Sequence, residues 1–144
     1  MVMDKINYWQ ERGFVKVARI YKSDRLTQGV DVEFFVNKKE YKVPGVYLLV
    51  YKDEVVKVGQ SANILSRLDM QYKCVTNLGN NRIRAEIKEK YISVDVYVYK
   101  VPKKDFTLLE YTFPINYQKG LEEAMLHDFY KKLNRIPVLN LQRN

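Results

Sequence analysis

The chain has 144 residues, of which 47% are hydrophobic, which is enough for one compact domain and too little for two. No apolar run approaches the roughly 18 residues that a membrane-spanning helix needs, and the polar N-terminal segment is unlike a signal peptide. We therefore expect a cytoplasmic protein without a membrane partner. Cys74 is the only cysteine, which excludes an intramolecular disulfide. The net charge of +8 favours a polyanionic partner, of which nucleic acid is the commonest.

The first part of the chain, residues 1–43, is predicted to be an N-terminal helix and a β-rich extension. A short helix is expected over 4–12, where apolar residues share one face and a glycine follows. Residues 14–21 are β-like. Apolar and acidic residues alternate over 30–34, which is the two-residue period of a half-buried strand. We take this part as an extension of the main domain, residues 44–144.

The main domain is predicted to contain three strands and three helices. In chain order they are strands at 46–51 and 55–59, a helix capped by Ser61, a helix around 83–91, a strand at 92–99 and a helix at 118–133. Loops are expected at 77–80 and 102–116, and an extended end at 137–140. A hairpin followed by a third strand predicts an α+β fold, with a small antiparallel three-stranded central sheet flanked by helices.

Several short motifs lie on these elements in a characteristic order. They are Gly45-Val46-Tyr47, Lys57-Val58-Gly59, Ser61 with Asn63, Arg67, Glu122 in Leu121-Glu122-x-x-Met125-Leu126, and the closing Pro137-x-x-Asn140. Together they resemble the GIY-YIG endonuclease domain, with a degenerate second triplet. The resemblance covers about residues 44 to 140. It implies the same α+β fold and the hydrolysis of phosphodiester bonds in DNA.

The resemblance also implies a role for each motif residue. Tyr47 is expected to be the general base that takes a proton from water. Arg67 is expected to bind the scissile phosphate, because a guanidinium offers several donors in a planar fork. Glu122 is expected to hold one Mg²⁺ or Mn²⁺, which would stabilise negative charge on the phosphate as a Lewis acid.

Lys57 departs from the family pattern, which usually has tyrosine there. Some GIY-YIG restriction enzymes resemble this sequence in having lysine at that place. Tyr47 and Lys57 lie on paired strands, so their side chains could meet if they share a face of the sheet. An ammonium group beside a tyrosine hydroxyl favours the phenolate. We therefore predict that Lys57 activates Tyr47.

Two positions leave alternatives open. Many family members carry histidine or tyrosine four residues after the arginine, where this chain has Gln71. Glutamine cannot act as a base, so the base is either Tyr47 or Tyr72. Glu123 competes with Glu122 as the metal ligand.

Further residues are predicted to contact DNA, because they lie near a helix N-terminus or carry groups that bind phosphate or bases. These residues are Gln60, Ser61, Asn63, Tyr72, Arg82, Arg84 and Asn140, with Asn134 as the alternative to Asn140. The extension over 1–43 could add contacts of its own.

The sequence thus predicts a metal-dependent DNA endonuclease, most closely similar to a sequence-specific type II restriction enzyme. Double-stranded DNA is the expected partner, and a palindromic target would be read by a homodimer that cuts one strand per subunit. The alternatives are a homing, phage or repair nuclease of the same family, and a protein of the same fold that binds DNA without cutting it.

Overall fold

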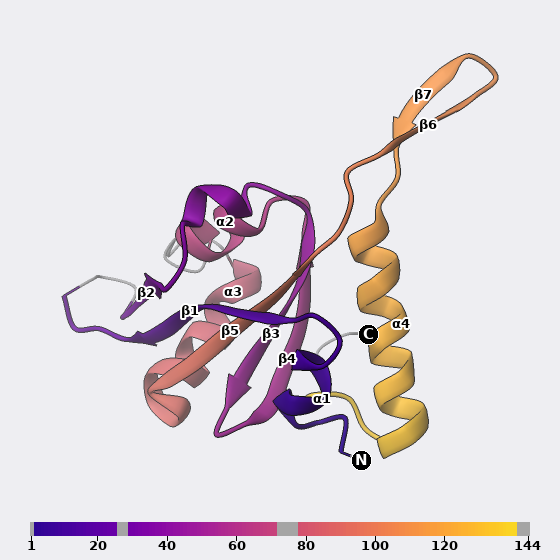
Figure 1. The fold of residues 1–144 in the computed structure, drawn as a ribbon. Helices are drawn as coiled ribbons and strands as arrows, with labels where there is room; N and C mark the ends of the chain where they lie inside the picture. The colour runs from indigo at the N-terminus through magenta and orange to yellow at the C-terminus, as the bar shows by residue number, and fades with distance from the viewer. Residues whose placement is uncertain (1, 26–28, 72–77, 141–144) are drawn as a thin grey trace.

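Five strands form one antiparallel sheet in the computed structural model, which describes residues 2–25, 29–71 and 78–140. The strands follow the order β2-β1-β5-β3-β4 across the sheet (Figure 1). Their bounds are β1 Val15–Lys22, β2 Val30–Phe34, β3 Gly45–Tyr51, β4 Glu54–Ser61 and β5 Ser93–Lys100. Strands β3 and β4 form the predicted hairpin, whose two-residue turn has left-handed backbone at Lys52 and Asp53 (φ 47° and 68°).

The predicted sheet of three strands is too small. Strands β3, β4 and β5 pair as expected, but the extension joins them, because β1 pairs along the other side of β5 and β2 pairs with β1. Ile20 of β1, for example, lies opposite Val94 of β5. Strand periodicity shows that a segment is half-buried, but it carries no information about which distant strand is its partner. The proposed division between residues 43 and 44 stays a prediction.

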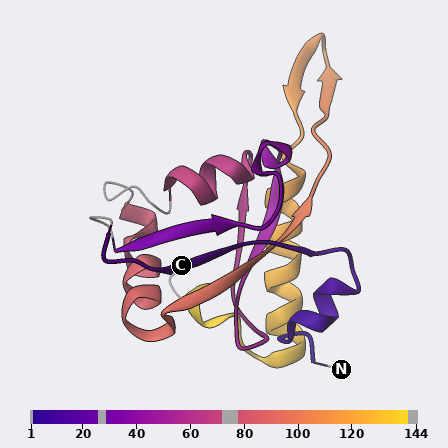
Figure 2. The same cartoon turned by 60° about the vertical axis from the view of Figure 1, so that its left-hand side comes forward.

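Helices cover both faces of the sheet (Figures 1 and 2). Their bounds are α1 Ile6–Gln10, α2 Ile64–Ser66, α3 Leu78–Glu86 and α4 Tyr117–Leu133, with π-helical turns at Arg67–Gln71 and Ile87–Tyr91 and 3₁₀ turns at Lys38–Tyr41 and Val138–Asn140. One face packs on α2 and the turn after α3, through buried residues Tyr47, Leu49, Ile64, Leu68 and Ile87. The other face packs on α1 and α4, through buried residues Val46, Leu48, Val58, Trp9, Met125 and Phe129.

Helix α1 is fastened to the turn of the β3–β4 hairpin and to the end of α4. The amide of Ile6 donates to the carbonyl of Asp53 at 2.8 Å. Trp9 stacks on Phe129 with ring centroids 5.8 Å apart. The guanidinium of Arg135 donates to the carboxylate of Asp4 at 2.6 Å. The C-terminal half of α4 therefore lies at the hairpin-turn end of the sheet.

Three predicted loops or ends have regular structure. The predicted loop over 102–116 contains a second hairpin, β6 Asp105–Leu108 and β7 Tyr111–Pro114. Residues 78–80 are the first turn of α3, while residue 77 lies outside the described part. The predicted extended end is a 3₁₀ turn, Val138–Asn140. No helix within the described residues is long and apolar enough to cross a membrane.

Candidate active site

Tyr47 and Gly59, one from each triplet, lie directly opposite each other on β3 and β4. The tyrosine ring extends across the glycine: a Cβ atom at Gly59 would lie 2.5 Å from the Tyr47 hydroxyl oxygen. Only a residue without a side chain leaves room for the ring at this place. Tyr47 is completely buried, at 0% exposure. Because β4 is an edge strand, the Tyr47 hydroxyl lies at the outer edge of the sheet.

Lys57 is on the same face of the sheet as Tyr47. It lies opposite Leu49, and Leu49 is two residues after Tyr47 on the same strand. Lys57 is therefore a diagonal cross-strand neighbour of Tyr47, a placement in which long side chains can meet. The condition that the two residues share a face, on which the predicted role of Lys57 depends, is satisfied.

Arg67 follows α2 on the side of the sheet that Tyr47 faces, between the buried residues Ile64 and Leu68. Its Nε atom is buried and has no hydrogen-bond partner among the described residues. An unpaired buried donor is costly, so such donors are normally matched by an acceptor. A phosphate oxygen would supply one. This geometry is consistent with the predicted phosphate-binding role.

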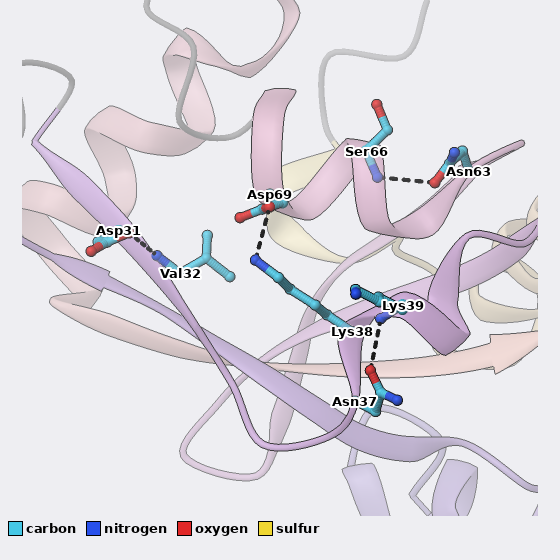
Figure 3. Close-up of polar contacts among 8 residues, drawn as sticks. All are labelled: Asp31, Val32, Asn37, Lys38, Lys39, Asn63, Ser66 and Asp69. Atoms are coloured by element: carbon cyan, nitrogen blue, oxygen red, sulfur yellow. Dashed lines mark hydrogen bonds and ion pairs between the residues drawn. The ribbon is translucent and has the colours of Figure 1, made fainter.

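The start of α2 is held by Asn63, and the predicted cap at Ser61 is wrong. The Asn63 side chain accepts from the amide of Ser66 at 3.0 Å (Figure 3). The hydroxyl of Ser61 accepts from the amide of Asn63 at 3.0 Å and donates to its carbonyl at 2.9 Å. Both side chains therefore order the turn into α2, the helix directly before Arg67. Their predicted DNA contacts stay predictions.

Glu122 and Glu123 differ in burial. Glu122 lies on the buried stripe of α4 with Met125 and Leu126 and is 8% exposed, whereas Glu123 is exposed. The structure thus places Glu122 against the sheet and Glu123 in solvent. Gln118, one helical turn before Glu122, is also buried. Its spacing of four from Glu122 was readable in the sequence, but a glutamine near a helix start carries no distinctive signal.

The N-terminal half of α4 lies at the same end of the sheet as Tyr47. Its C-terminal half contacts α1 at the hairpin-turn end, so Glu122 lies toward the opposite end, where Gly45 pairs with Ser61. Helix α4 packs against β4, the strand over which the Tyr47 ring extends. Tyr47 and Glu122 therefore approach one end of the same edge strand, from the two faces of the sheet. Gln60, on the face of β4 that also carries Val58, lies at this end as well.

Glu122 is the carboxylate that would hold a divalent metal ion at this end of the sheet. Within the ranges that the structure describes, no group of three or more His, Cys, Asp or Glu side chains could hold a metal ion. Mg²⁺ is commonly bound through one or two carboxylates, keeps several waters and contacts substrate phosphates. A single buried glutamate fits this pattern, so the side chain of Glu122 is compatible with Mg²⁺.

Asn140 and Arg82 have structural roles. The Asn140 side chain accepts from the amide of Val58 and donates to the carbonyl of Val58, both at 2.8 Å, and is buried. It therefore pairs with the free edge of β4 as another strand would. Arg82 of α3 donates to the carbonyl of Leu139 at 2.5 Å and holds this turn in place. The predicted DNA contacts of Asn140 and Arg82 find no support in this geometry.

Two further residues that were predicted to contact DNA are Arg84 and Tyr72. Arg84 is buried at 4% exposure and has an interaction partner within the protein. Tyr72, which was also the alternative base, lies outside the described residues.

Figure 3 shows that Lys38, from the 3₁₀ turn before β3, reaches across to Asp69 after α2, with 3.3 Å between Nζ and Oδ2. This ion pair joins the extension to the segment that carries Arg67.

Two other tyrosines are poorly suited to act as a base. Burial, and then the charge of Glu40, raises the pKa of Tyr41 above its ordinary value of 10.0. Burial, followed by Asp95 and Asp53, raises the pKa of Tyr97 in the same way. Both hydroxyls therefore stay protonated at neutral pH.

The fold and the order of these motifs define a protein with the GIY-YIG nuclease fold, as the sequence predicted. Two solved structures are similar over most of their length. The restriction endonuclease HPY188I, in complex with product DNA, aligns with a TM-score of 0.60 and 20% identity, over 98% of this chain and 87% of its own. A mutant of EndoII from bacteriophage T4 aligns with a TM-score of 0.64 and 18% identity, over 88% of this chain and 94% of its own. No family model and no curated protein sequence matches the chain.

Proposed function

We propose that the chain is a metal-dependent DNA endonuclease that hydrolyses phosphodiester bonds. The observation that carries the proposal is the arrangement of the motif residues: Tyr47, Lys57 and the segment of Arg67 lie on one face of the sheet, and Glu122 approaches the same edge strand from the other face. The fold supports it, because one of the similar structures is a restriction endonuclease bound to its product DNA. The net charge of +8 suits a polyanionic substrate.

In the proposed reaction, the phenolate oxygen of deprotonated Tyr47 accepts a proton from the attacking water and becomes the hydroxyl, and Lys57 stabilises the phenolate. Arg67 donates to the phosphate oxygens and stabilises the charge that builds on them. A metal ion held by Glu122 would supply Lewis-acid stabilisation of the same charge. Because Tyr47 is completely buried in the chain without DNA, side chains around its hydroxyl must shift when DNA binds, as catalytic contacts often tighten only in the complex.

A type II restriction enzyme acting as a homodimer on a palindromic site is the proposed setting. Lys57 in the second triplet and the similarity to a restriction endonuclease support it. A phage-type nuclease is the second candidate, since the EndoII structure matches with a TM-score of 0.64. End mapping of digested plasmid distinguishes them: discrete ends at one palindromic sequence indicate a restriction enzyme, and ends at many different sequences indicate the second candidate.

The metal role is tested by two neighbouring substitutions on α4. Glu122→Gln is expected to abolish plasmid cleavage in Mg²⁺ or Mn²⁺ while leaving binding to a DNA duplex largely intact. Glu123→Gln is the matched control, because its side chain is exposed, and it should cut like the wild type. Loss of cleavage in Glu123→Gln alone would refute the assignment. A wild-type protein that cuts no DNA with either metal over a range of salt would refute the proposed function.

The proton-transfer role is tested at Tyr47 and Lys57. Tyr47→Phe removes only the hydroxyl and should lower the cleavage rate by about 10²- to 10⁴-fold, the usual contribution of general acid–base catalysis. Lys57→Met should lower the cleavage rate, because the phenolate loses its cationic neighbour. A Lys57→Met variant that cuts as fast as the wild type would exclude the activating role.

A further inference from the structure

The β6–β7 hairpin projects from the body of the protein in both views (Figures 1 and 2). Every residue from 102 to 114 is exposed. The hairpin connects β5 to α4, and its base is closed by the amide of Ile115, which donates to the carbonyl of Lys104 at 2.8 Å. It is a separate two-stranded ribbon, outside the five-stranded sheet.

One face of this ribbon is entirely apolar and aromatic. Phe106 lies opposite Phe113, and Leu108 lies opposite Tyr111, so all four side chains share one face. They are exposed by 49% (Phe106), 54% (Leu108), 75% (Tyr111) and 42% (Phe113). The opposite face is polar, and its Thr107 and Thr112 hydroxyl groups lie 3.0 Å apart in a hydrogen bond.

The ribbon has few means of stabilising itself. A two-stranded hairpin without a packed face is marginally stable in water. Its tight turn has left-handed backbone at Leu109 and Glu110, with φ of 52° and 70°, a conformation that favours glycine or asparagine over either residue. The leucine at the tip is 89% exposed. The apolar face, which the chain alone leaves in solvent, is therefore the element that needs a partner.

The negative charge of the ribbon disfavours DNA as its partner and favours a basic protein. Residues 105 to 114 include Asp105 and Glu110 and no lysine or arginine, so the ribbon is acidic on a chain with a net charge of +8. DNA phosphates would repel these carboxylates. A second copy of this chain, which is basic and carries the same apolar face, fits both features.

We propose that the apolar face of the β6–β7 ribbon is a dimerisation surface and packs against the same face of a second copy about a two-fold axis. An interface between identical patches must be self-complementary. With the two ribbons pointing in opposite directions, Glu110 at one tip lies near Lys103 and Lys104 at the base of the other. The arrangement therefore pairs apolar with apolar groups, and it places Glu110 beside two lysines and one carboxylate, Asp105, at the base of the other ribbon. The proposal deepens the proposed function, whose palindromic target requires a dimer.

The size of the face sets the expected strength of the dimer. Four large side chains that are each about half exposed offer on the order of 400 Å² per subunit. A standard interface buries about 800 Å² per partner. The ribbon alone falls below this size and is therefore expected to form a weak, reversible dimer.

The oligomeric state without DNA tests the proposal independently of catalysis. In sedimentation equilibrium from low to high micromolar protein, the wild-type average mass should rise from one chain toward two. Phe106→Ser/Phe113→Ser, on the apolar face, should stay at the mass of one chain throughout. Thr107→Ser/Thr112→Ser, on the opposite face, is the matched control and should behave like the wild type. A wild type that stays monomeric, or a dimer unaffected by Phe106→Ser/Phe113→Ser, overturns the proposal.

The pairing of Glu110 with Lys103 and Lys104 of the second copy is tested by reversing the charges of these residues. Glu110→Lys should weaken the dimer at least several-fold at low salt, and adding Lys103→Glu/Lys104→Glu should restore it. Failure of the restoration overturns the proposed direction of the ribbons. DNA is the competing occupant: a monomeric wild type whose duplex affinity falls in Phe106→Ser/Phe113→Ser would replace the second copy with DNA. Cleavage failure with an intact dimer would refute only the proposed function.

Discussion

At the scale of single residues, Gly59 shows why a triplet motif ends in glycine. The glycine provides the space over which the Tyr47 ring lies, so its role is steric and concerns a residue twelve positions earlier. The motif was visible in the sequence as a resemblance. The reason for the glycine depends on the cross-strand register, which places Gly59 opposite Tyr47.

We expect Gly59→Ala to disturb the site severely, because the new methyl group would occupy the space of the Tyr47 ring. Overpacking of this kind typically costs about 1–3 kcal/mol. Both the free energy of unfolding in urea and the cleavage rate should fall. Gly120→Ala is the control, because a Cβ there meets no atom within 4 Å. It should stabilise α4 by up to about 1 kcal/mol. Equal stability of Gly59→Ala and wild type would contradict this account.

Asn140 is a second residue whose role only the tertiary contacts reveal. Asn140→Ala leaves the amide and carbonyl of Val58 without their partner. Each buried unsatisfied group costs about 1–3 kcal/mol, so the melting temperature should drop clearly. Val138→Ala, in the same turn but exposed, should change it little. If Asn140→Ala melts like the wild type but binds DNA more weakly, the original DNA-contact prediction is correct.

At the scale of elements, α1 joins one face of the sheet and α4 through one aromatic residue, Trp9. Trp9 packs edge-on to Phe14 and stacks on Phe129 of α4, while its indole nitrogen donates to the carbonyl of Met3 at 2.6 Å. The sequence predicted the helix and its apolar face. It did not predict that α4, more than a hundred residues later, is the surface on which that face packs.

Trp9→Ala should lower the free energy of unfolding by about 3–5 kcal/mol, the usual cost of truncating a buried aromatic side chain. Circular dichroism during urea unfolding measures the effect, since Trp9 is the only tryptophan and its fluorescence is lost. Gln10→Ala, on the exposed side of α1, should leave stability nearly unchanged. An unfolding midpoint of Trp9→Ala equal to that of the wild type would show that α1 does not contribute to the core.

The β6–β7 hairpin, unlike α1, is an element that the sequence did not predict. The stretch 102–116 was predicted as a loop, because alternation over four residues per strand is short and no glycine or asparagine marks the turn. Its strands are nonetheless paired from Asp105 to Pro114. Hairpin turns are recognised in a sequence by glycine or asparagine, so a turn made by Leu109 and Glu110 is not predicted.

At the scale of the whole molecule, the extension over 1–43 and the predicted main domain, residues 44–144, share one sheet. Strand β1 covers one side of β5 along most of its length, and β3 covers the other. A fragment of residues 44–144 would expose the β1 side of β5 and lose Ile20 and Val17 from the core.

We therefore expect the 44–144 fragment to lack the cooperative thermal transition of the full chain. Amide exchange of the fragment should show little protection in β5, whereas β5 should be among the best-protected strands of the full chain. Addition of a peptide of residues 1–43 should restore some protection. A fragment that unfolds cooperatively on its own would establish the predicted boundary at residue 43 as a true domain boundary.

The sequence by itself determined the α+β class, most of the elements and the fold resemblance, because these depend on local periodicity and on short motifs. It also indicated Glu122 over Glu123 from the apolar spacing of α4, and the burial of the two residues is consistent with that choice. The tertiary structure decided the rest. The five-strand order, the packing of Tyr47 over Gly59, the fastening of β4 by Asn140 and the exposed face of β6–β7 all depend on contacts between distant segments. Local patterns cannot specify such contacts, because an alternating strand or a terminal asparagine can be satisfied by many partners.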